Sequence, residues 1–315
     1  ALYFTNGQCV AAYLQGRRVQ QMLEMIKNFQ TPDFTDLPKK ELKARVINYP
    51  WDLVHHNSEQ IALDFLQMNV SGRILGEVSS HAVLLNKSEI YLGEGSTIKA
   101  GAILDAENGP IYIGSDVTVL PNAVIEGPAF VGNRTIIKIG AKIYEGTSIG
   151  EVCKVGGEVE ESIIHAFSNK QHEGFLGHSY LGEWVNIGAD TNNSDLKNNY
   201  STVKVYIKGQ LIDSGSLFVG LFMGDHSKSG INTMFNTGTV VGVMSNVFGA
   251  GYPPKYIPSF TWGGAEALVE HNFDKAIDTA RKVMSRRKVE FTDAHKRLYR
   301  NIFEMTRDER NKLIA

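Results

Sequence analysis

The sequence predicts a mainly β protein, a left-handed parallel β-helix of hexapeptide repeats with a remnant α/β segment before it and two C-terminal α-helices. The main observation is an aliphatic residue at every sixth position from Ile113 to Val155. This period matches neither the helical period of about 3.6 residues nor the strand period of about 2. It is typical of a β-helix in which three short strands form one triangular coil. The series is Ile113, Val119, Ile125, Val131, Ile137, Ile143, Ile149 and Val155.

A second observation supports the same fold. Most of these aliphatic residues are preceded, two positions earlier, by a small residue. Such residues are expected where the chain bends at a corner, because a large side chain would not fit there. Cys153 occupies one of these positions, so we interpret it as a packing residue. The small residues are Ala123, Ala129, Thr135, Ala141, Thr147 and Cys153.

The composition is that of an ordinary globular protein. The 315 residues are 43% hydrophobic and 21% charged. A net charge of −2 gives no electrostatic reason to expect nucleic acid or an anionic membrane as a partner. No apolar run approaches the roughly 18 residues of a membrane span, and no signal peptide is visible, so we expect a cytoplasmic protein.

Residues 1–70 are expected to be the remnant of an α/β domain followed by a linker. Residues 1–14 alternate apolar and polar residues around Asn6-Gly7, which predicts a β-hairpin. Helices are expected over 17–29 and 58–68. A hairpin and one helix cannot bury a core alone, so we expect the main part of this domain to lie outside the chain.

The β-helix is expected over residues 71–250. The sixfold pattern lapses after Val155 and resumes at Leu181, and an asparagine-rich excursion follows over 190–199. Residues 251–315 are expected to form a crossing segment rich in proline and aromatic residues, and then two helices. Between these helices, Arg286-Arg287-Lys288 is interpreted as a solvated turn, with a phosphate site as the alternative.

The motif that points to chemistry is KQHEGFLG at 170–177, followed by YLGEWVNIGA at 180–189. It resembles the acetyltransferase domain of the bifunctional N-acetylglucosamine-1-phosphate uridyltransferase family. The resemblance implies transfer from acetyl-CoA, with His172 as general base and Asn186 as the conserved asparagine. Histidine suits proton transfer near neutral pH. For the acetyl-CoA site we predict Ala189, Gly220 and Thr237.

The sequence departs from the family pattern at the phosphate of the sugar substrate. The family's phosphate-binding arginine falls on Tyr144, and its lysine falls near Ser162, just after several glutamates. We therefore expect glucosamine-1-phosphate to bind weakly in the usual place, or another amino sugar to be the acceptor. His226 is interpreted as a substrate contact or as a polar corner residue. The predicted substrate-binding residues are Lys170, Asp190, Asn192, Asn193, Lys197 and His226.

The front of the chain resembles the family more loosely. Residues 49–53, YPWDL, look like the end of a sugar-phosphate nucleotidyltransferase domain, whose nucleotide loop is not in this sequence. Mg²⁺ is expected only if that domain is present. The predicted partners are a sugar substrate, acetyl-CoA and two further copies of the chain in a homotrimer.

Two alternatives to the acetyltransferase remain. One is a non-catalytic β-helix that oligomerises or binds an effector within a sugar-1-phosphate nucleotidyltransferase. The other is a zinc β-helix of the carbonic-anhydrase type, which needs three histidines at coil-related positions. The spacing of His165, His172 and His178 does not suit such a site across a subunit interface.

Overall fold

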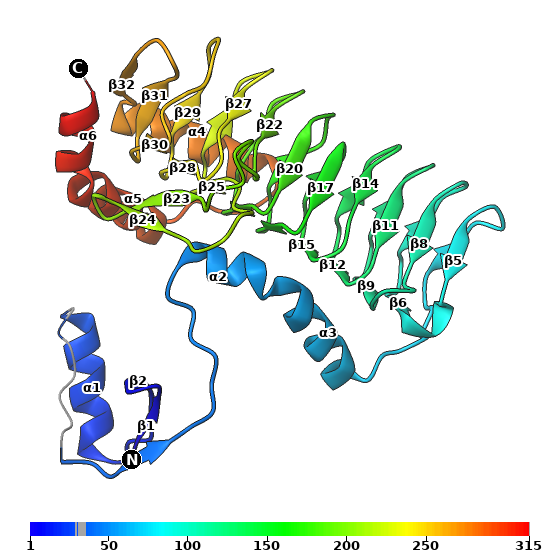
Figure 1. The fold of residues 1–315 in the computed structure, drawn as a ribbon, viewed down its shortest axis with the longest axis horizontal. Coiled ribbons are helices and arrows are strands. Elements are labelled where there is room, and N and C mark those ends of the chain that lie inside the picture. Colours follow the sequence, from blue (N-terminus) through cyan, green and yellow to red (C-terminus); the bar gives the residue numbers. More distant parts are fainter. Residues whose placement is uncertain (29, 31–35, 315) are drawn as a thin grey trace. The chain divides into compact units, whose positions relative to one another are not determined.

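The computed structural model describes residues 1–28, 30 and 36–314, and the chain divides into two compact units, Ala1–Tyr49 and Pro50–Ala315 (Figure 1). The division therefore falls within the segment 1–70 that the sequence predicts to be a domain remnant and linker. The reason is that the helices after Pro50 pack on the coils. Asn57 donates a hydrogen bond to the Gly146 carbonyl at 2.7 Å, and its side-chain oxygen accepts one from Ser148 Oγ at 2.9 Å.

The first unit contains the predicted hairpin. Its two strands are antiparallel, and the turn residues Asn6 and Gly7 both have positive φ, as a tight two-residue turn requires. The helix predicted over 17–29 ends at Lys27, and Phe29 lies outside the described residues. The elements of this unit are β1 (Leu2–Thr5), β2 (Gln8–Ala12), α1 (Arg17–Lys27) and β3 (Lys39–Glu41).

The second unit is a parallel β-helix, as the hexapeptide pattern predicts. Its short strands pair with their equivalents one coil away and so build three faces (Figure 1). The first face contains β4 (Glu77–Val78), β7 (Thr97–Ile98), β10 (Thr118–Val119), β13 (Ile136–Ile137), β16 (Lys154–Val155), β19 (Asn169–Lys170), β26 (Lys228–Ser229), β29 (Asn246–Val247) and β31 (Thr261–Gly263).

The two other faces repeat the arrangement. The second face contains β5 (Val83–Leu85), β8 (Ile103–Asp105), β11 (Val124–Glu126), β14 (Lys142–Ile143), β17 (Glu158–Glu160) and β20 (Phe175–Gly177), with β22 (Asn192–Asn193) and β27 (Met234–Phe235) paired farther along. The third face contains β6 (Ile90–Leu92), β9 (Ile111–Ile113), β12 (Ala129–Val131), β15 (Thr147–Ile149), β18 (Ile163–Ile164), β21 (Tyr180–Leu181), β25 (Phe222–Met223), β28 (Val240–Val241) and β30 (Tyr256–Ile257).

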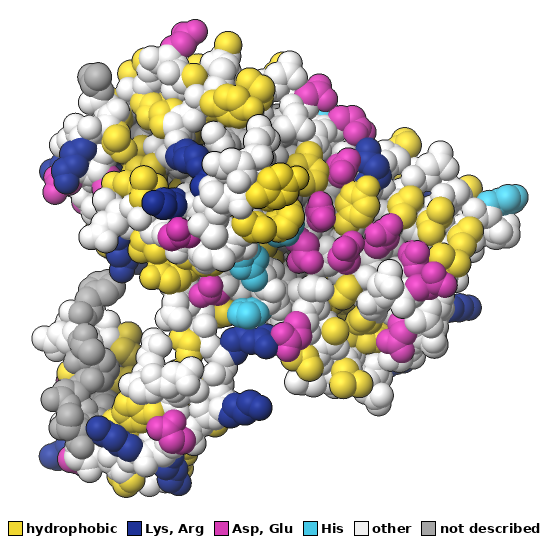
Figure 2. All heavy atoms as spheres, viewed as in Figure 1, with side chains coloured by type: hydrophobic (Ala, Val, Ile, Leu, Met, Phe, Trp, Pro, Cys, Tyr) yellow, Lys and Arg dark blue, Asp and Glu magenta, His cyan; other side chains and the backbone are white. Residues whose placement is uncertain are grey.

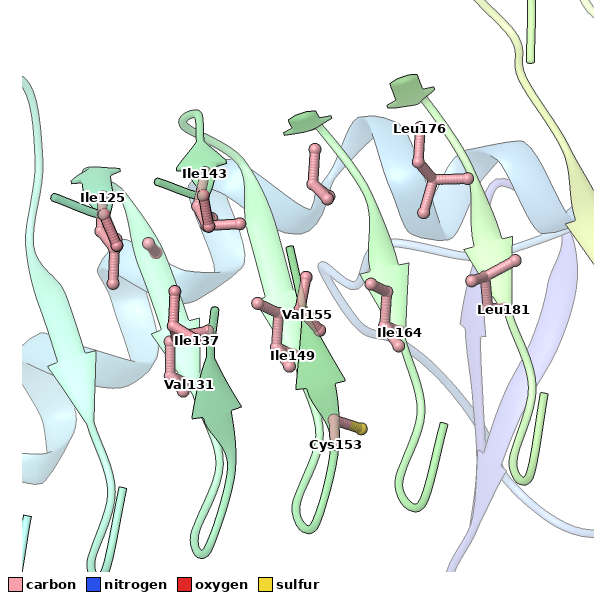
Figure 3. Close-up of a cluster of buried hydrophobic side chains, with 14 of the residues drawn as sticks. Ile125, Val131, Ile137, Ile143, Ile149, Cys153, Val155, Ile164, Leu176 and Leu181 are labelled. Atoms are coloured by element: carbon pink, nitrogen blue, oxygen red, sulfur yellow. The ribbon is translucent and has the colours of Figure 1, made fainter. Parts of the chain in front are cut away.

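The aliphatic series forms the core of this β-helix. Figure 3 shows these side chains pointing into the interior, coil after coil. Ile137, for example, is 0% exposed and pairs with Val119 on one side and Val155 on the other. Cys153 is also buried, at a corner, and burial raises the pKa of its thiol to about 12. Its interpretation as a packing residue fits this position.

The coils continue through the region where the sequence pattern lapses. Val159 and Ile164 face inward after Val155, at spacings shorter than six residues. The next inward position is taken by Lys170, which pairs with Val155 and is 1% exposed. Its ammonium group donates hydrogen bonds to the carbonyls of Gly156 and His172 at 3.0 and 2.9 Å. A lysine can therefore replace an aliphatic residue here, because backbone oxygens satisfy its charge.

The asparagine-rich excursion is longer than the sequence suggested. It includes an antiparallel hairpin of β23 (Lys204–Ile207) and β24 (Gln210–Asp213) before the coils resume at β25. The predicted crossing segment after residue 250 is also different, because β30 and β31 add further strands to the coils. Ile257 is fully buried in the same inward stack, which explains this extension.

Helices pack on the β-helix at two places. α3 (Asn57–Met68) contacts the third face at β12 and β15. α4 (Phe273–Arg286) and α5 (Asp293–Met305) pack on Met244 and Phe260 in a second apolar cluster. Thr292 is the N-cap of α5, in a capping box with His295. The remaining elements are α2 (Pro50–His55), a 3₁₀ turn (Lys87–Glu89), β32 (Leu268–Glu270) and α6 (Arg307–Leu313). Among the described residues, every helix is too short or too polar to span a bilayer.

Candidate active site

The motif histidine and asparagine lie on consecutive coils. His172 follows β19 at an exposed corner, where its carbonyl accepts the hydrogen bond from Lys170. Asn186 lies one coil farther on, bridged to Asn169 on one side and Lys228 on the other. The His172 side chain is exposed, and within the described residues its imidazole makes no hydrogen bond.

Asn186 lines a pocket of about 450 Å³ between the first face and the C-terminal turns of α4. We call it the basic pocket. Gln171 also lines it, and His172 follows Gln171 directly in the chain. The pocket unites side chains more than 100 residues apart in the sequence, which is why no local motif indicated it. The lining residues are Lys154, Phe167, Asn169, Gln171, Trp184, Asn186, Lys228, Val283, Arg286 and Arg287.

Hydrogen bonds fix two cations of the basic pocket. The Lys228 ammonium donates to the His226 carbonyl at 2.8 Å, and burial lowers the pKa of Lys228 to about 8. Arg287 Nη2 donates to Asn169 Oδ1 at 3.0 Å. The interpretation of Arg286-Arg287-Lys288 as a solvated turn is therefore wrong for Arg287, which the fold brings to the first face of the β-helix, whereas Arg286 and Lys288 are exposed.

The position of the family's phosphate-binding arginine is acidic in this chain. Burial, and then the charges of Glu158 and Glu126, raise the pKa of Tyr144. Ser162, near the family's lysine position, is fully buried and donates its hydroxyl to the Glu160 carbonyl at 2.7 Å. Figure 2 shows acidic side chains gathered along the middle coils on the face in view. These acidic surroundings disfavour a phosphate at Tyr144, as the sequence suggested.

A second histidine has the environment of a general base, and sequence reasoning did not select it. His178 Nδ1 lies 2.8 Å from Asp195 Oδ2, and both side chains are mostly buried. The ring also stacks on Phe218, with centroids 5.0 Å apart. A carboxylate in this position orients an imidazole. The available signal was the spacing of 17 residues between His178 and Asp195, which is about one coil.

His226 is not placed to contact a substrate, so that prediction is wrong. Its side chain is 2% exposed, stacked on Trp184 and edge-on to Tyr299 of α5. Neither ring nitrogen has a hydrogen-bond partner among the described residues. Burial, followed by the charge of Lys228, lowers its pKa to about 3. α5 packs over this corner, and His226 is therefore buried although the sequence around it is polar.

Lys170 and Asn193 are also turned away from solvent. Lys170 is buried as described above, and Asn193 is 5% exposed. The Asn193 amide accepts a hydrogen bond from the Gly177 nitrogen at 2.9 Å and donates one to the Gly177 carbonyl at 3.0 Å. Both side chains thus serve the backbone of the coils, which corrects their prediction as substrate contacts.

The remaining predicted residues are dispersed. Asp190 and Asn192 are exposed, and Asn192 Oδ1 accepts a hydrogen bond from the Phe175 backbone N–H at 2.8 Å. Lys197 and Thr237 line another pocket, of about 580 Å³, with asparagines of the excursion. Ala189 is half-buried.

Gly220 is buried, and a Cβ there would lie 1.9 Å from the Gly177 carbonyl oxygen. Close packing therefore accounts for the glycine at this position. Within residues 1–28, 30 and 36–314, no cluster of three or more His, Cys, Asp or Glu side chains is arranged to hold a metal ion.

The buried His226 predicts a pH dependence of stability. In the unfolded chain its pKa returns to about 6.5, whereas in the fold it is about 3, so below pH 6.5 the unfolded state binds the proton first. The free energy of unfolding should fall by up to about 1.4 kcal/mol per pH unit between these values. His226 has a positive φ, and so do Phe167 and Phe260 on other coils. The variant His226→Phe therefore keeps an aromatic ring at a backbone conformation that phenylalanine already adopts in this chain. Urea unfolding at pH 7.5 and pH 5 should show a smaller loss for this variant than for wild type. An equal loss would contradict the assignment.

The stacked coils define a hexapeptide-repeat β-helix protein, and comparison with known proteins confirms the resemblance stated from the sequence. The chain is 29% identical over 225 residues to the bifunctional sugar-1-phosphate nucleotidylyltransferase/acetyltransferase of Sulfurisphaera tokodaii. The aligned region covers 69% of this chain and 50% of that protein. It is 29% identical over 195 residues to the bifunctional protein GlmU of a Synechococcus species, covering 60% of this chain and 37% of that protein. The chain thus spans about half, or less, of the length of these relatives.

Among solved structures, a UDP-N-acetylglucosamine acyltransferase has 16% sequence identity and a TM-score of 0.39, covering 69% of this chain and 76% of that chain. No family model matches the sequence.

Proposed function

We propose that this chain is an acetyl-CoA-dependent N-acetyltransferase acting on an amino sugar or amino-sugar phosphate. The observation that carries the proposal is the placement of the matched motif. Its histidine and asparagine lie on consecutive coils of one β-helix, and the asparagine faces a pocket next to the corner that bears the histidine. The names of the similar curated proteins support the same reaction class.

The proposed reaction is direct transfer of an acetyl group. The amine of the sugar attacks the thioester carbonyl of acetyl-CoA, and His172 removes a proton from this amine. Backbone amides or the Asn186 amide hold the negative oxygen of the tetrahedral intermediate. The carbon–sulfur bond then breaks, and the coenzyme leaves as a thiol after taking up a proton. The products are the N-acetylated sugar and free coenzyme A.

The alternative function is a β-helix that oligomerises or binds an effector without catalysis. Two observations favour it. The position of the family's phosphate clamp is acidic around Tyr144, and the exposed His172 ring lacks an orienting partner among the described residues. Isothermal titration with acetyl-CoA separates the two functions. We expect saturable binding for the acetyltransferase, whereas no heat at millimolar acetyl-CoA would favour the alternative.

We also propose a homotrimer, because the outer faces of a β-helix gain depth for a ligand only where two subunits meet. Light scattering at micromolar concentration should give about three times the 34.8 kDa mass of one chain. A monomeric mass under these conditions would contradict the proposed trimer.

A further inference from the structure

The basic pocket carries positive charge that none of the described carboxylates neutralises through an ion pair. Lys154, Lys228, Arg286 and Arg287 line it, and none of the four forms an ion pair with a described Asp or Glu. Elsewhere cations do find carboxylates, such as Lys142 with Glu173 at 3.7 Å. Like charges around a partly enclosed cavity repel one another, and a bound anion removes this repulsion.

The charges are also arranged for recognition. Lys228 and Arg287 are fixed by their hydrogen bonds to the His226 carbonyl and to Asn169. Asn169 and Asn186 lie next to each other on the first face and offer amide groups beside the cations. Guanidinium and ammonium groups suit phosphate oxygens, and side-chain amides suit the hydroxyls of an attached sugar.

We infer that the basic pocket binds the phosphate group of a phosphorylated ligand. The inference rests on the proposed function, because it takes the ligand to be one of the two reactants. An amino-sugar phosphate and coenzyme A both carry such a group. The two arginines come from the C-terminal end of α4 and the two lysines come from the coils, so the site needs both parts of the fold.

The test is isothermal titration of the full chain with glucosamine-1-phosphate and, separately, with acetyl-CoA. The main variant is Arg286→Gln/Arg287→Gln, and Lys154→Gln is a second variant on the coil side. Lys275→Gln, an exposed residue of α4 that does not line the pocket, is the matched control. We expect the double variant to weaken binding of one ligand about a hundredfold, Lys154→Gln about tenfold, and the control less than twofold. Glucosamine, which has no phosphate, should bind to the wild type and to the variants with the same affinity.

The outcomes separate the ligands and the two proposals. Weakened glucosamine-1-phosphate binding identifies the sugar phosphate as the occupant, and weakened acetyl-CoA binding identifies the coenzyme. Phosphate-dependent binding without any acetyl transfer would keep the site and overturn the proposed function. Acetyl transfer with unchanged affinities in both pocket variants would keep the function and overturn the site. Absence of binding of both ligands to the wild-type chain would also overturn the site.

Discussion

His172→Ala is expected to lower the rate of acetyl transfer by about 10²–10⁴-fold, the usual loss when a general base is removed. The side chain is exposed at a corner, so the fold should be unaffected. The measurement is release of the coenzyme thiol at saturating acetyl-CoA, with circular dichroism to confirm the fold. A loss of only a few-fold would indicate that the residue positions the substrate.

The control and the competing base are both available in the chain. His81→Ala changes another exposed histidine, among the first coils, and should keep the wild-type rate. His178→Ala removes the ring held by Asp195. If this variant lost the activity while His172→Ala kept it, the general base would be His178 and the assignment from the family motif would be wrong.

Ile137→Ala is expected to lower the free energy of unfolding by about 2–5 kcal/mol, because it opens a cavity in the middle of the inward stack. The side chain is 0% exposed between coils on both sides. Ile139→Ala is the matched control, since this isoleucine lies two residues farther on and is 64% exposed. It should change stability by no more than about 0.5 kcal/mol. Equal effects in urea unfolding would contradict the inward register.

The period of six residues was sufficient to predict the β-helix and the inward direction of residues such as Ile137. It was not sufficient where the turn at a corner has fewer residues, because the inward positions then fall out of the sixfold pattern although the coils continue. The buried Lys170 shows the physical reason. A polar side chain occupies an aliphatic position when two backbone carbonyls accept its protons, and a hydrophobicity pattern cannot detect those carbonyls.

The candidate site was predictable only in part. The family motif located Asn186, which does line a pocket, and the loss of cations around Tyr144 was evident from the sequence. The cations of the basic pocket were not, since Arg286 and Arg287 reach the coils only through the packing of α4. His226 was misjudged for a similar reason, because α5 places Tyr299 over a corner that looks polar in the sequence.

The most direct test of the central claim is mass spectrometry of the acceptor after incubation of the chain with acetyl-CoA and an amino sugar or its phosphate. The proposed function predicts an acetylated amine that forms in proportion to enzyme, saturates with both substrates and decreases with His172→Ala. An acceptor that remains unmodified with glucosamine, glucosamine-1-phosphate and nucleotide-linked amino sugars, while the chain is folded, would contradict the account and favour the non-catalytic β-helix.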